Sequence, residues 1–255
     1  VTLELGGKSP AIVSANVPLR DAAERIAFGK TLNAGQTCVA PDYVLVPKDR
    51  VDGFVAAYKE VVQRFLPTLK DNPDYTAVIN ERQLARLKSY ISDAESKGAQ
   101  IIPLYAEGQG RRLPHTLLLN VNDEMKVMQD EIFGPLLPVI PYDKLEDALT
   151  FINDRDRPLA LYYFGYDKAE QQHVLEQTHS GGVCLNDTML HVAQDDMPFG
   201  GVGPSGMGHY HGHEGFKTFS HAKSTFIKQR FNAAAMIYPP YGKAIQKLVY
   251  KLFVR

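Results

Sequence analysis

The chain has 255 residues, of which 44% are hydrophobic, so it is long enough to bury a substantial core. Its formal net charge is −1, and its basic and acidic residues read as interleaved, which excludes a general attraction to nucleic acid and makes a membrane partner unexpected. No apolar run approaches the roughly 20 residues that span a bilayer. Two cysteines without metal-site or disulfide spacing indicate a reducing, cytoplasmic compartment.

The predicted elements alternate between helices and short apolar strands. The chain opens on residues 1–5 with the pattern of a strand already under way, so we expect a piece of a longer polypeptide. Apolar residues then recur at helical spacing in 19–27, 51–65, 84–94, 145–152 and after a capping box at 167–170, and β-rich runs lie at 43–46, 101–103 and 183–186. The alternation predicts an α/β fold with a largely parallel open sheet flanked by helices, and ligands beyond the carboxyl ends of the strands.

Cys38 is the first candidate for chemistry. It lies in the polar loop 33–41, between a predicted helix and a predicted strand, where reactive groups can meet a substrate. A nearby base or helix terminus that favours the thiolate would let it attack a carbonyl carbon and hold a covalent intermediate. The alternative is a small buried side chain, which is the better interpretation for Cys184 because apolar residues flank it on a predicted strand.

Two carboxylates are candidates to act beside such a thiol. Glu4 lies in an apolar strand end before Gly6 and Gly7, so we expect partial desolvation, which raises a carboxyl pKa and suits a general base. An edge-strand glutamate that points into water is the alternative. Glu131 stands before Phe133 and a Gly-Pro turn that could present its carboxylate to ribose hydroxyls, although an ordinary turn explains the same pattern.

Two further patterns are rejected as sites. Residues 201–206 match G-x-G-x-x-G, but no strand directly precedes them and Pro204 disrupts the helix that a dinucleotide-binding motif requires. His209, His211 and His213 alternate without a carboxylate or cysteine at ligand spacing, so no metal is expected. The chain therefore shows no dinucleotide-binding motif of its own.

Four segments in order resemble the aldehyde dehydrogenase superfamily from its second half onward. They are Leu3–Pro10 (LELGGKSP), Gly35–Cys38 (GQTC), Glu131–Pro135 (EIFGP) and Pro198–Gly201 (PFGG). Three more segments resemble the class 3 enzymes and, among these, the branch that oxidises coniferyl aldehyde: 38–43, 207–212 and 216–221. The resemblance covers essentially the whole chain and treats the histidines as part of a class-specific loop.

The resemblance implies that an aldehyde is oxidised to a carboxylic acid with NAD or NADP. Aryl aldehydes such as coniferyl aldehyde are among the substrates that it suggests. In that reaction Cys38 would attack the aldehyde to give a thiohemiacetal, which passes a hydride to the nicotinamide and leaves a thioester on the sulfur. Glu4 would then activate the water that hydrolyses the thioester.

The resemblance also implies who contacts cofactor and substrate. Glu131 would hold the nicotinamide ribose, Phe133 would pack near the nicotinamide ring, and Leu5 would touch the cofactor. Phe199 would touch the aldehyde, whereas Asn186 would have a structural role near the entrance of the site.

A division of the chain follows from the same resemblance. Residues 1–215 correspond to the catalytic domain, with 1–8 as the end of a nucleotide-binding domain, and 216–255 correspond to an oligomerisation strand and a C-terminal tail that imply a homodimer. In this family the Rossmann domain and an oxyanion-binding asparagine come before the first residue of this sequence. Since one oxyanion donor is worth about 10²–10³ in rate, we expect the 255-residue chain alone to be inactive as a dehydrogenase.

Two other functions and one surface stay open. A cofactor-free thiol hydrolase or acyltransferase would use Cys38 and Glu4 without a hydride step. A non-catalytic assembly module would add a strand at 218–227 to a partner sheet. In the tail 241–255, apolar residues lie on one helical face opposite lysines, which is compatible with weak binding to anionic lipid, although such a face more often packs on protein.

Overall fold

The computed structural model describes residues 1–253. It contains two compact units, Val1–Phe219 and Ser220–Arg255, which are treated separately below. None of the helices in the described part of the chain is long and apolar enough to cross a membrane.

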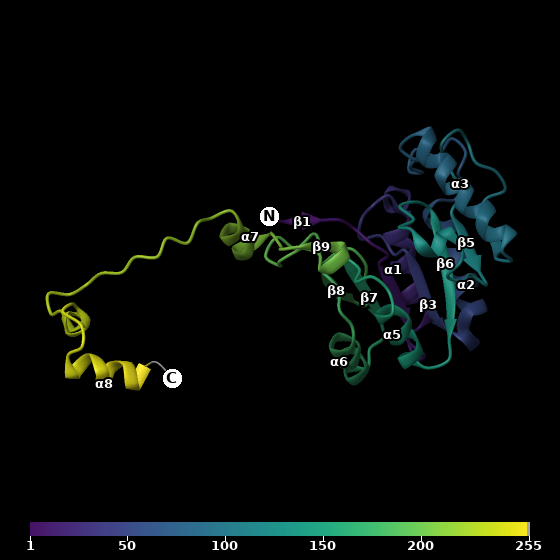
Figure 1. The fold of residues 1–255 in the computed structure, drawn as a ribbon. Coiled ribbons are helices and arrows are strands. Elements are labelled where there is room, and N and C mark those ends of the chain that lie inside the picture. Colours follow the sequence, from purple (N-terminus) through teal and green to yellow (C-terminus); the bar gives the residue numbers. More distant parts are fainter. Residues whose placement is uncertain (254–255) are drawn as a thin grey trace. The chain divides into compact units, whose positions relative to one another are not determined.

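A seven-stranded sheet forms the centre of the first unit (Figure 1). Its strands, in spatial order, are β4 (Gln100–Pro103), β5 (Thr116–Leu119), β6 (Leu136–Tyr142), β3 (Tyr43–Pro47), β2 (Pro10–Val13), β7 (Ala160–Phe164) and β8 (Gly182–Leu185). Every neighbouring pair is parallel except β4 and β5, which are antiparallel. The predicted α/β class with a largely parallel sheet is therefore confirmed.

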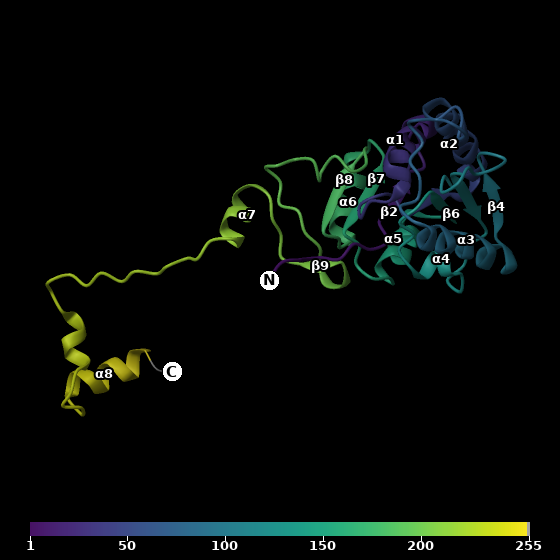
Figure 2. The same cartoon turned by 90° about the horizontal axis from the view of Figure 1, so that it is seen from above.

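Helices cover both faces of this sheet (Figure 2). The α-helices of the unit are α1 (Leu19–Thr31), α2 (Val51–Phe65), α3 (Glu81–Ser96), α4 (Lys126–Gln129), α5 (Leu145–Asn153), α6 (Lys168–Gln177) and α7 (Gly212–Thr218), and its 3-10 helices are η1 (Leu32–Gly35), η2 (Lys48–Arg50) and η3 (Gly203–Ser205). Along β2, Ala11 and Val13 pack with α1 and α2, whereas Ile12 packs with α3 and α5 on the opposite face. This alternation follows from the two-residue period of a strand.

A second, two-stranded sheet carries the start of the chain. β1 (Leu3–Glu4) pairs antiparallel with β9 (Gly206–Met207), so Glu4 lies opposite Gly206. A Cβ at Gly206 would lie 2.2 Å from the carbonyl oxygen of Leu3, and φ at this glycine is +149°. Only glycine therefore fits at the point where the Gly-rich loop approaches β1.

The second unit contains a 3-10 helix, η4 (Ala233–Ile237), and one α-helix, α8 (Ala244–Phe253). The strand expected at 218–227 is absent from the described chain, because α7 ends at Thr218 and residues 221–229 have no strand pairing. The backbone groups of a strand need hydrogen-bond partners on a neighbouring strand. Within the described residues no neighbouring strand pairs with this segment. Its pairing with another subunit stays a prediction.

Candidate functional site

The site forms where three loops meet at one edge of the sheet. Glu4, Cys38 and Glu131 each precede a parallel strand, namely β2, β3 and β6, and these strands are adjacent in the order β6-β3-β2. The loops that lead into adjacent parallel strands lie at the same edge, so the fold brings together residues far apart in sequence. The expected location beyond the carboxyl ends was wrong, because the candidate residues converge at the amino ends.

The loop before Cys38 has an unusual backbone that is held by specific contacts. Asn33, Ala34 and Gly35 follow one another with φ values of +51°, +54° and +72°. A Cβ at Gly35 would lie 2.5 Å from the carbonyl oxygen of Gly134, so glycine is required there. The Gln36 amide donates to the carbonyl of Ala77 at 3.1 Å and its oxygen accepts from the backbone N–H of Ile79 at 2.9 Å.

Cys38 and Glu4 are in contact. The Cys38 thiol donates to Glu4 Oε1, with 3.5 Å between Sγ and the oxygen. Burial and the negative charges of Glu4 and Glu131 raise the pKa of the Cys38 thiol to about 11. The expectation that neighbouring groups favour the thiolate was therefore wrong for this resting arrangement: the thiol is protonated at neutral pH and has a base beside it.

Glu4 uses both of its carboxylate oxygens. Oε2 accepts a short hydrogen bond from the hydroxyl of Tyr210, which raises the pKa of this tyrosine to about 12. The expectation of a desolvated Glu4 was wrong, because both residues of β1 are exposed. Pairing with the two-residue β9 covers the backbone of β1 but leaves the side chain open to water. Glu4 is thus an accessible carboxylate fixed between a thiol and a phenol.

Tyr210 is the residue of this cluster that the sequence did not single out. Its backbone N–H and carbonyl pair with those of Phe199 at 2.9 and 2.8 Å, which fixes the phenol above β1. The signal in the sequence is its position in the loop 207–212, which resembles the class 3 enzymes. Tyr210 lies there between His209 and His211, and the pattern of the loop is dominated by the alternating histidines.

Phe199 lies behind Tyr210 and is only 2% exposed. Its ring packs edge-on against Tyr210 at 5.8 Å and stacks on His211 at 5.9 Å. In this conformation Phe199 supports the ring of Tyr210 and presents almost no surface to a ligand. The proposed contact between Phe199 and an aldehyde therefore gains no support from its burial.

Glu131 lies half-buried against the glycines that follow Glu4. A Cβ at Gly6 would lie 2.9 Å from both carboxylate oxygens of Glu131, and the backbone N–H of Gly7 donates to this carboxylate. Burial is the largest of the effects that raise the pKa of Glu131 to about 7. The carboxylate thus sits directly on the backbone of the glycine pair, close to Leu5.

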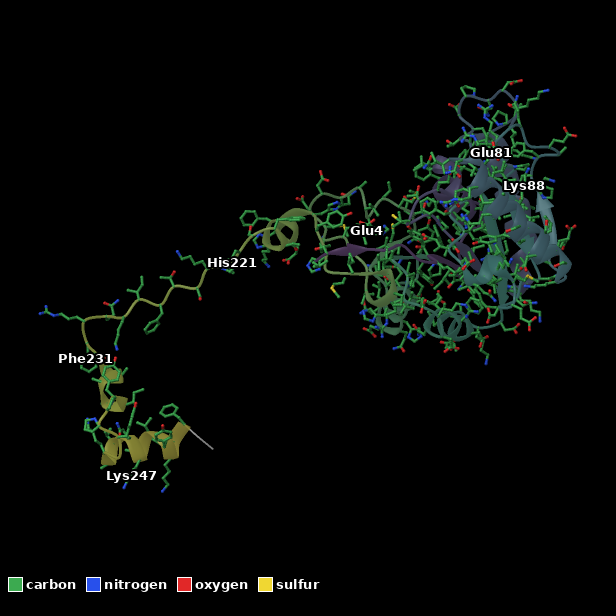
Figure 3. The ribbon with its side chains drawn as sticks, turned by 45° about the horizontal axis from the view of Figure 1, so that its top comes forward. Glu4, Glu81, Lys88, His221, Phe231 and Lys247 are labelled. Carbon is green, nitrogen blue, oxygen red and sulfur yellow. The ribbon has the colours of Figure 1, made fainter. Side chains whose placement is uncertain are left out.

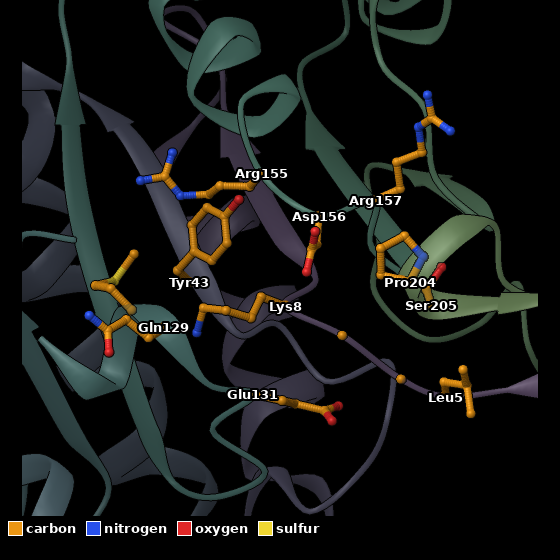
Figure 4. Close-up of a pocket in the computed structure, with 13 residues that line it drawn as sticks. Leu5, Lys8, Tyr43, Gln129, Glu131, Arg155, Asp156, Arg157, Pro204 and Ser205 are labelled. Atoms are coloured by element: carbon orange, nitrogen blue, oxygen red, sulfur yellow. The ribbon is translucent and has the colours of Figure 1, made fainter. Parts of the chain in front are cut away.

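A pocket of about 370 Å³ opens beside Glu131 and Leu5 (Figure 4). Its other lining residues are Gly6, Gly7, Lys8, Tyr43, Met128, Gln129, Arg155, Asp156, Arg157, Pro204 and Ser205. Leu5 is 59% exposed and Phe133 is 41% exposed, the latter with a left-handed φ of +48°. These exposed apolar side chains leave surface that a flat ring or a sugar can cover.

A buried ion pair ties the loops together. Lys8 Nζ forms a short ion pair with Asp42 and donates to the carbonyls of Val127 and Asp130 at 2.9 and 2.8 Å. The second carboxylate oxygen of Asp42 accepts from the backbone N–H of Ile132 at 2.9 Å. Because these bonds join the segments of all three candidate residues, the pair fixes the geometry of the site.

The remaining candidates behave as structural residues. Asn186 has a φ of +58°, and its side-chain oxygen accepts from the backbone N–H of Gly165 at 2.9 Å, in agreement with a structural role. Cys184 lies on β8 opposite Tyr162, and burial raises its pKa. No group of three potential metal ligands occurs among residues 1–253, and His209 instead lies 3.4 Å from Glu214.

Comparison with known proteins agrees with these features. Residues 1–225 match the aldehyde dehydrogenase family, and the chain belongs to this family. Over its full length it is 79% identical to a probable coniferyl aldehyde dehydrogenase of Pseudomonas aeruginosa, covering 54% of that protein. It is 49% identical to the coniferyl aldehyde dehydrogenase of Pseudomonas sp. strain HR199, over 98% of this chain and 53% of that protein.

A solved structure gives the same picture. The substrate-bound state of Staphylococcus aureus AldH superimposes with a TM-score of 0.87 and 40% identity, over 99% of this chain and 55% of that one. The chain thus spans about half the length of the curated relatives that it matches.

Proposed function

We propose that the protein that carries this sequence oxidises an aldehyde to a carboxylic acid with NAD or NADP, with Cys38 as nucleophile and Glu4 as general base. The contact between the Cys38 thiol and Glu4 Oε1 at 3.5 Å is the observation that carries this proposal. It places a nucleophile in hydrogen-bond contact with a proton acceptor, at a separation that the larger sulfur atom allows.

The first step is addition of the thiol to the aldehyde. Because the pKa of Cys38 is about 11, the proton must leave as sulfur attacks, and Glu4 is placed to take it. The new carbon–sulfur bond forms as the carbonyl π electrons move to oxygen, which gives a thiohemiacetal after protonation. NAD(P)⁺, when bound, would supply the hydride acceptor for the former aldehyde carbon. The thiohemiacetal hydroxyl releases its proton to water as the hydride leaves, so that a thioester remains on Cys38.

The second step is hydrolysis of that thioester. Glu4 is exposed, so water can reach the carboxylate after it has returned its first proton to solvent. Glu4 then takes a proton from this water as its oxygen attacks the acyl carbon, the carbon–sulfur bond breaks, and the Cys38 thiolate is reprotonated. Tyr210 holds the carboxylate in place through Oε2 during both steps.

The residues present fit the nicotinamide end of the cofactor. Glu131 offers two carboxylate oxygens at a pocket, and the absence of a side chain at Gly6 lets them approach the backbone beside Glu4. Ribose hydroxyls are donors that a carboxylate accepts well. We assign Glu131 to the ribose and the exposed Leu5 and Phe133 to apolar contact with the cofactor.

We further propose an aromatic aldehyde of the coniferyl type as substrate, since relatives up to 79% identical carry that name. Direct contact between Phe199 and the aldehyde stays a prediction, and in the structure the buried ring of Phe199 packs against Tyr210. Both cysteines are free, which supports a reducing, cytoplasmic location. We propose a homodimer in which residues 218–227 add a strand to a partner sheet.

The test uses the whole protein that carries this sequence and measures formation of reduced nicotinamide from coniferyl aldehyde by absorbance, in wild type and in Cys38→Ser, Glu4→Gln and Cys184→Ser. The proposal predicts loss of at least about 10³-fold activity in Cys38→Ser, a loss of 10²–10⁴-fold in Glu4→Gln and near-normal rates in Cys184→Ser. Ester hydrolysis by Cys38 that is indifferent to NAD(P), with no aldehyde oxidation, would instead support the cofactor-free hydrolase.

A further inference from the structure

The charge of the chain is divided between its two units. All 29 acidic residues precede Gly215, and the last of them is Glu214. The second unit contains seven of the 28 basic residues: Lys223, Lys228, Arg230, Lys243, Lys247, Lys251 and Arg255. The first unit therefore has a formal charge of −8 and the second +7, which the near-neutral total conceals. The expectation of interleaved charge was wrong for this segment.

Helix α8 separates apolar from basic residues around its axis. At about 100° per residue, Ile245, Leu248 and Leu252 fall within an arc of about 60°, and Lys247 and Lys251 flank this arc, about 130° and about 90° from its centre. Lys243, just before the helix, continues the basic side. The three apolar side chains are 38%, 53% and 64% exposed, so the described chain leaves this face largely uncovered.

We propose that α8 lies in the surface of an anionic phospholipid bilayer, with Ile245, Leu248 and Leu252 toward the acyl chains. Lys247 and Lys251 stand on the side where the headgroup phosphates would lie, and Figure 3 shows Lys247 projecting from this helix. Long lysine side chains reach headgroups while their stems cover apolar surface. The assignment is peripheral and involves no crossing of the bilayer.

Charge favours a lipid surface as the occupant. Clusters of four to eight basic residues beside an amphipathic helix are attracted to anionic lipid, and the second unit has seven with no acidic residue to oppose them. A protein groove would cover the apolar face and leave the flanking lysines in water, whereas a bilayer surface contacts the apolar face with its acyl chains and the flanking lysines with its headgroups. A second copy of the chain, whose first unit is acidic, is the alternative that the test must separate.

The short length of α8 limits the membrane affinity that we expect. Helix α8 has 10 residues, and a single short amphipathic helix binds membranes marginally and reversibly. Two exposed aromatic residues, Tyr241 before the helix and Phe253 at its end, add apolar surface at the interface. Binding should therefore be measurable at low salt and fall steeply as salt rises, because surface potentials are screened within a Debye length.

The experiment is sedimentation of the full chain with two kinds of vesicle. One is phosphatidylcholine alone, and the other contains about 30% phosphatidylglycerol, which gives the vesicle a negative surface potential. Three variants are compared with wild type: Lys243→Gln/Lys247→Gln/Lys251→Gln, Leu248→Gln, and a matched control with three exposed lysines of the first unit replaced, Lys59→Gln/Lys88→Gln/Lys168→Gln.

We expect binding only to the anionic vesicles, a loss on the order of 100-fold in the tail lysine variant, and a clear loss in Leu248→Gln. The control variant should bind like wild type. Equal binding to both vesicle types, or unchanged binding in the tail variants, would overturn the proposal. A tail variant whose solution mass falls, with no vesicle binding by wild type, would assign α8 to a second copy of the chain.

Discussion

Replacement of Glu4 by glutamine should make Cys38 more reactive toward alkylating agents, although it should slow aldehyde turnover by about 10²–10⁴-fold. The pKa of the Cys38 thiol is about 11, compared with an ordinary 9.0. Burial is the largest cause, and the charge and the hydrogen bond of the Glu4 carboxylate come next. If removal of the Glu4 charge lowers the pKa of Cys38 from about 11 to about 10, the thiolate fraction at pH 8.5 rises from about 0.3% to about 3%. Alkylation should then accelerate about 10-fold, because the thiolate is the nucleophile.

The assay is the rate of reaction with iodoacetamide between pH 7 and 11, in a Cys184→Ser background so that one thiol reports. A Glu131→Gln variant is the matched control, since Glu131 also raises the pKa of Cys38 but ranks below Glu4 among the causes. It should accelerate alkylation less than Glu4→Gln does. A slower reaction in Glu4→Gln, or an unchanged pH midpoint, would refute the electrostatic reasoning.

Four further outcomes are expected. Tyr210→Phe should slow the decay of an acyl group on Cys38 by about 10- to 100-fold, less than full loss of the base, as followed by quenched-flow mass spectrometry. Asp42→Ala should destabilise the protein by about 1.5–3 kcal/mol in chemical unfolding, because it removes the hydrogen-bonded carboxylate partner of the partly buried Lys8. Gly6→Ala should weaken NAD(P) binding about 10-fold in a fluorescence titration, and wild-type affinity should fall below pH 7 as Glu131 becomes protonated.

The regular part of the fold was accessible from the sequence. Apolar periodicity located α1, α2 and α3, and the capping interaction predicted at Asp167 is present, where its carboxylate accepts from the backbone N–H of Glu170 at 2.9 Å. Short buried strands such as β2 and β7 were not assigned, since a run of four or five apolar residues has no period that distinguishes strand from helix.

The candidate residues were also accessible, but not their electrostatics. Motif order indicated Cys38, Glu4 and Glu131, whereas the pKa of a thiol depends on distances to charges from other loops, which a linear sequence does not contain. Tyr210 could not be predicted for the same reason, since its partner Glu4 is 206 positions away in the sequence. The two residues meet only because β1 pairs with β9 and Phe199 pairs with Tyr210.

The most direct test of the central claim is to trap the acyl intermediate. The protein is mixed with coniferyl aldehyde and NAD(P)⁺, quenched in acid, and digested for peptide mass spectrometry, with Glu4→Gln compared with wild type. We predict that the variant accumulates an acyl thioester on the peptide of Cys38 and that wild type shows little. Without Glu4 the pKa of Cys38 is lower, so the thiolate can still add to the aldehyde, whereas hydrolysis of the thioester has lost its base. Reduced nicotinamide formed without any acyl group on Cys38, or an acyl group on Cys184, would contradict the account.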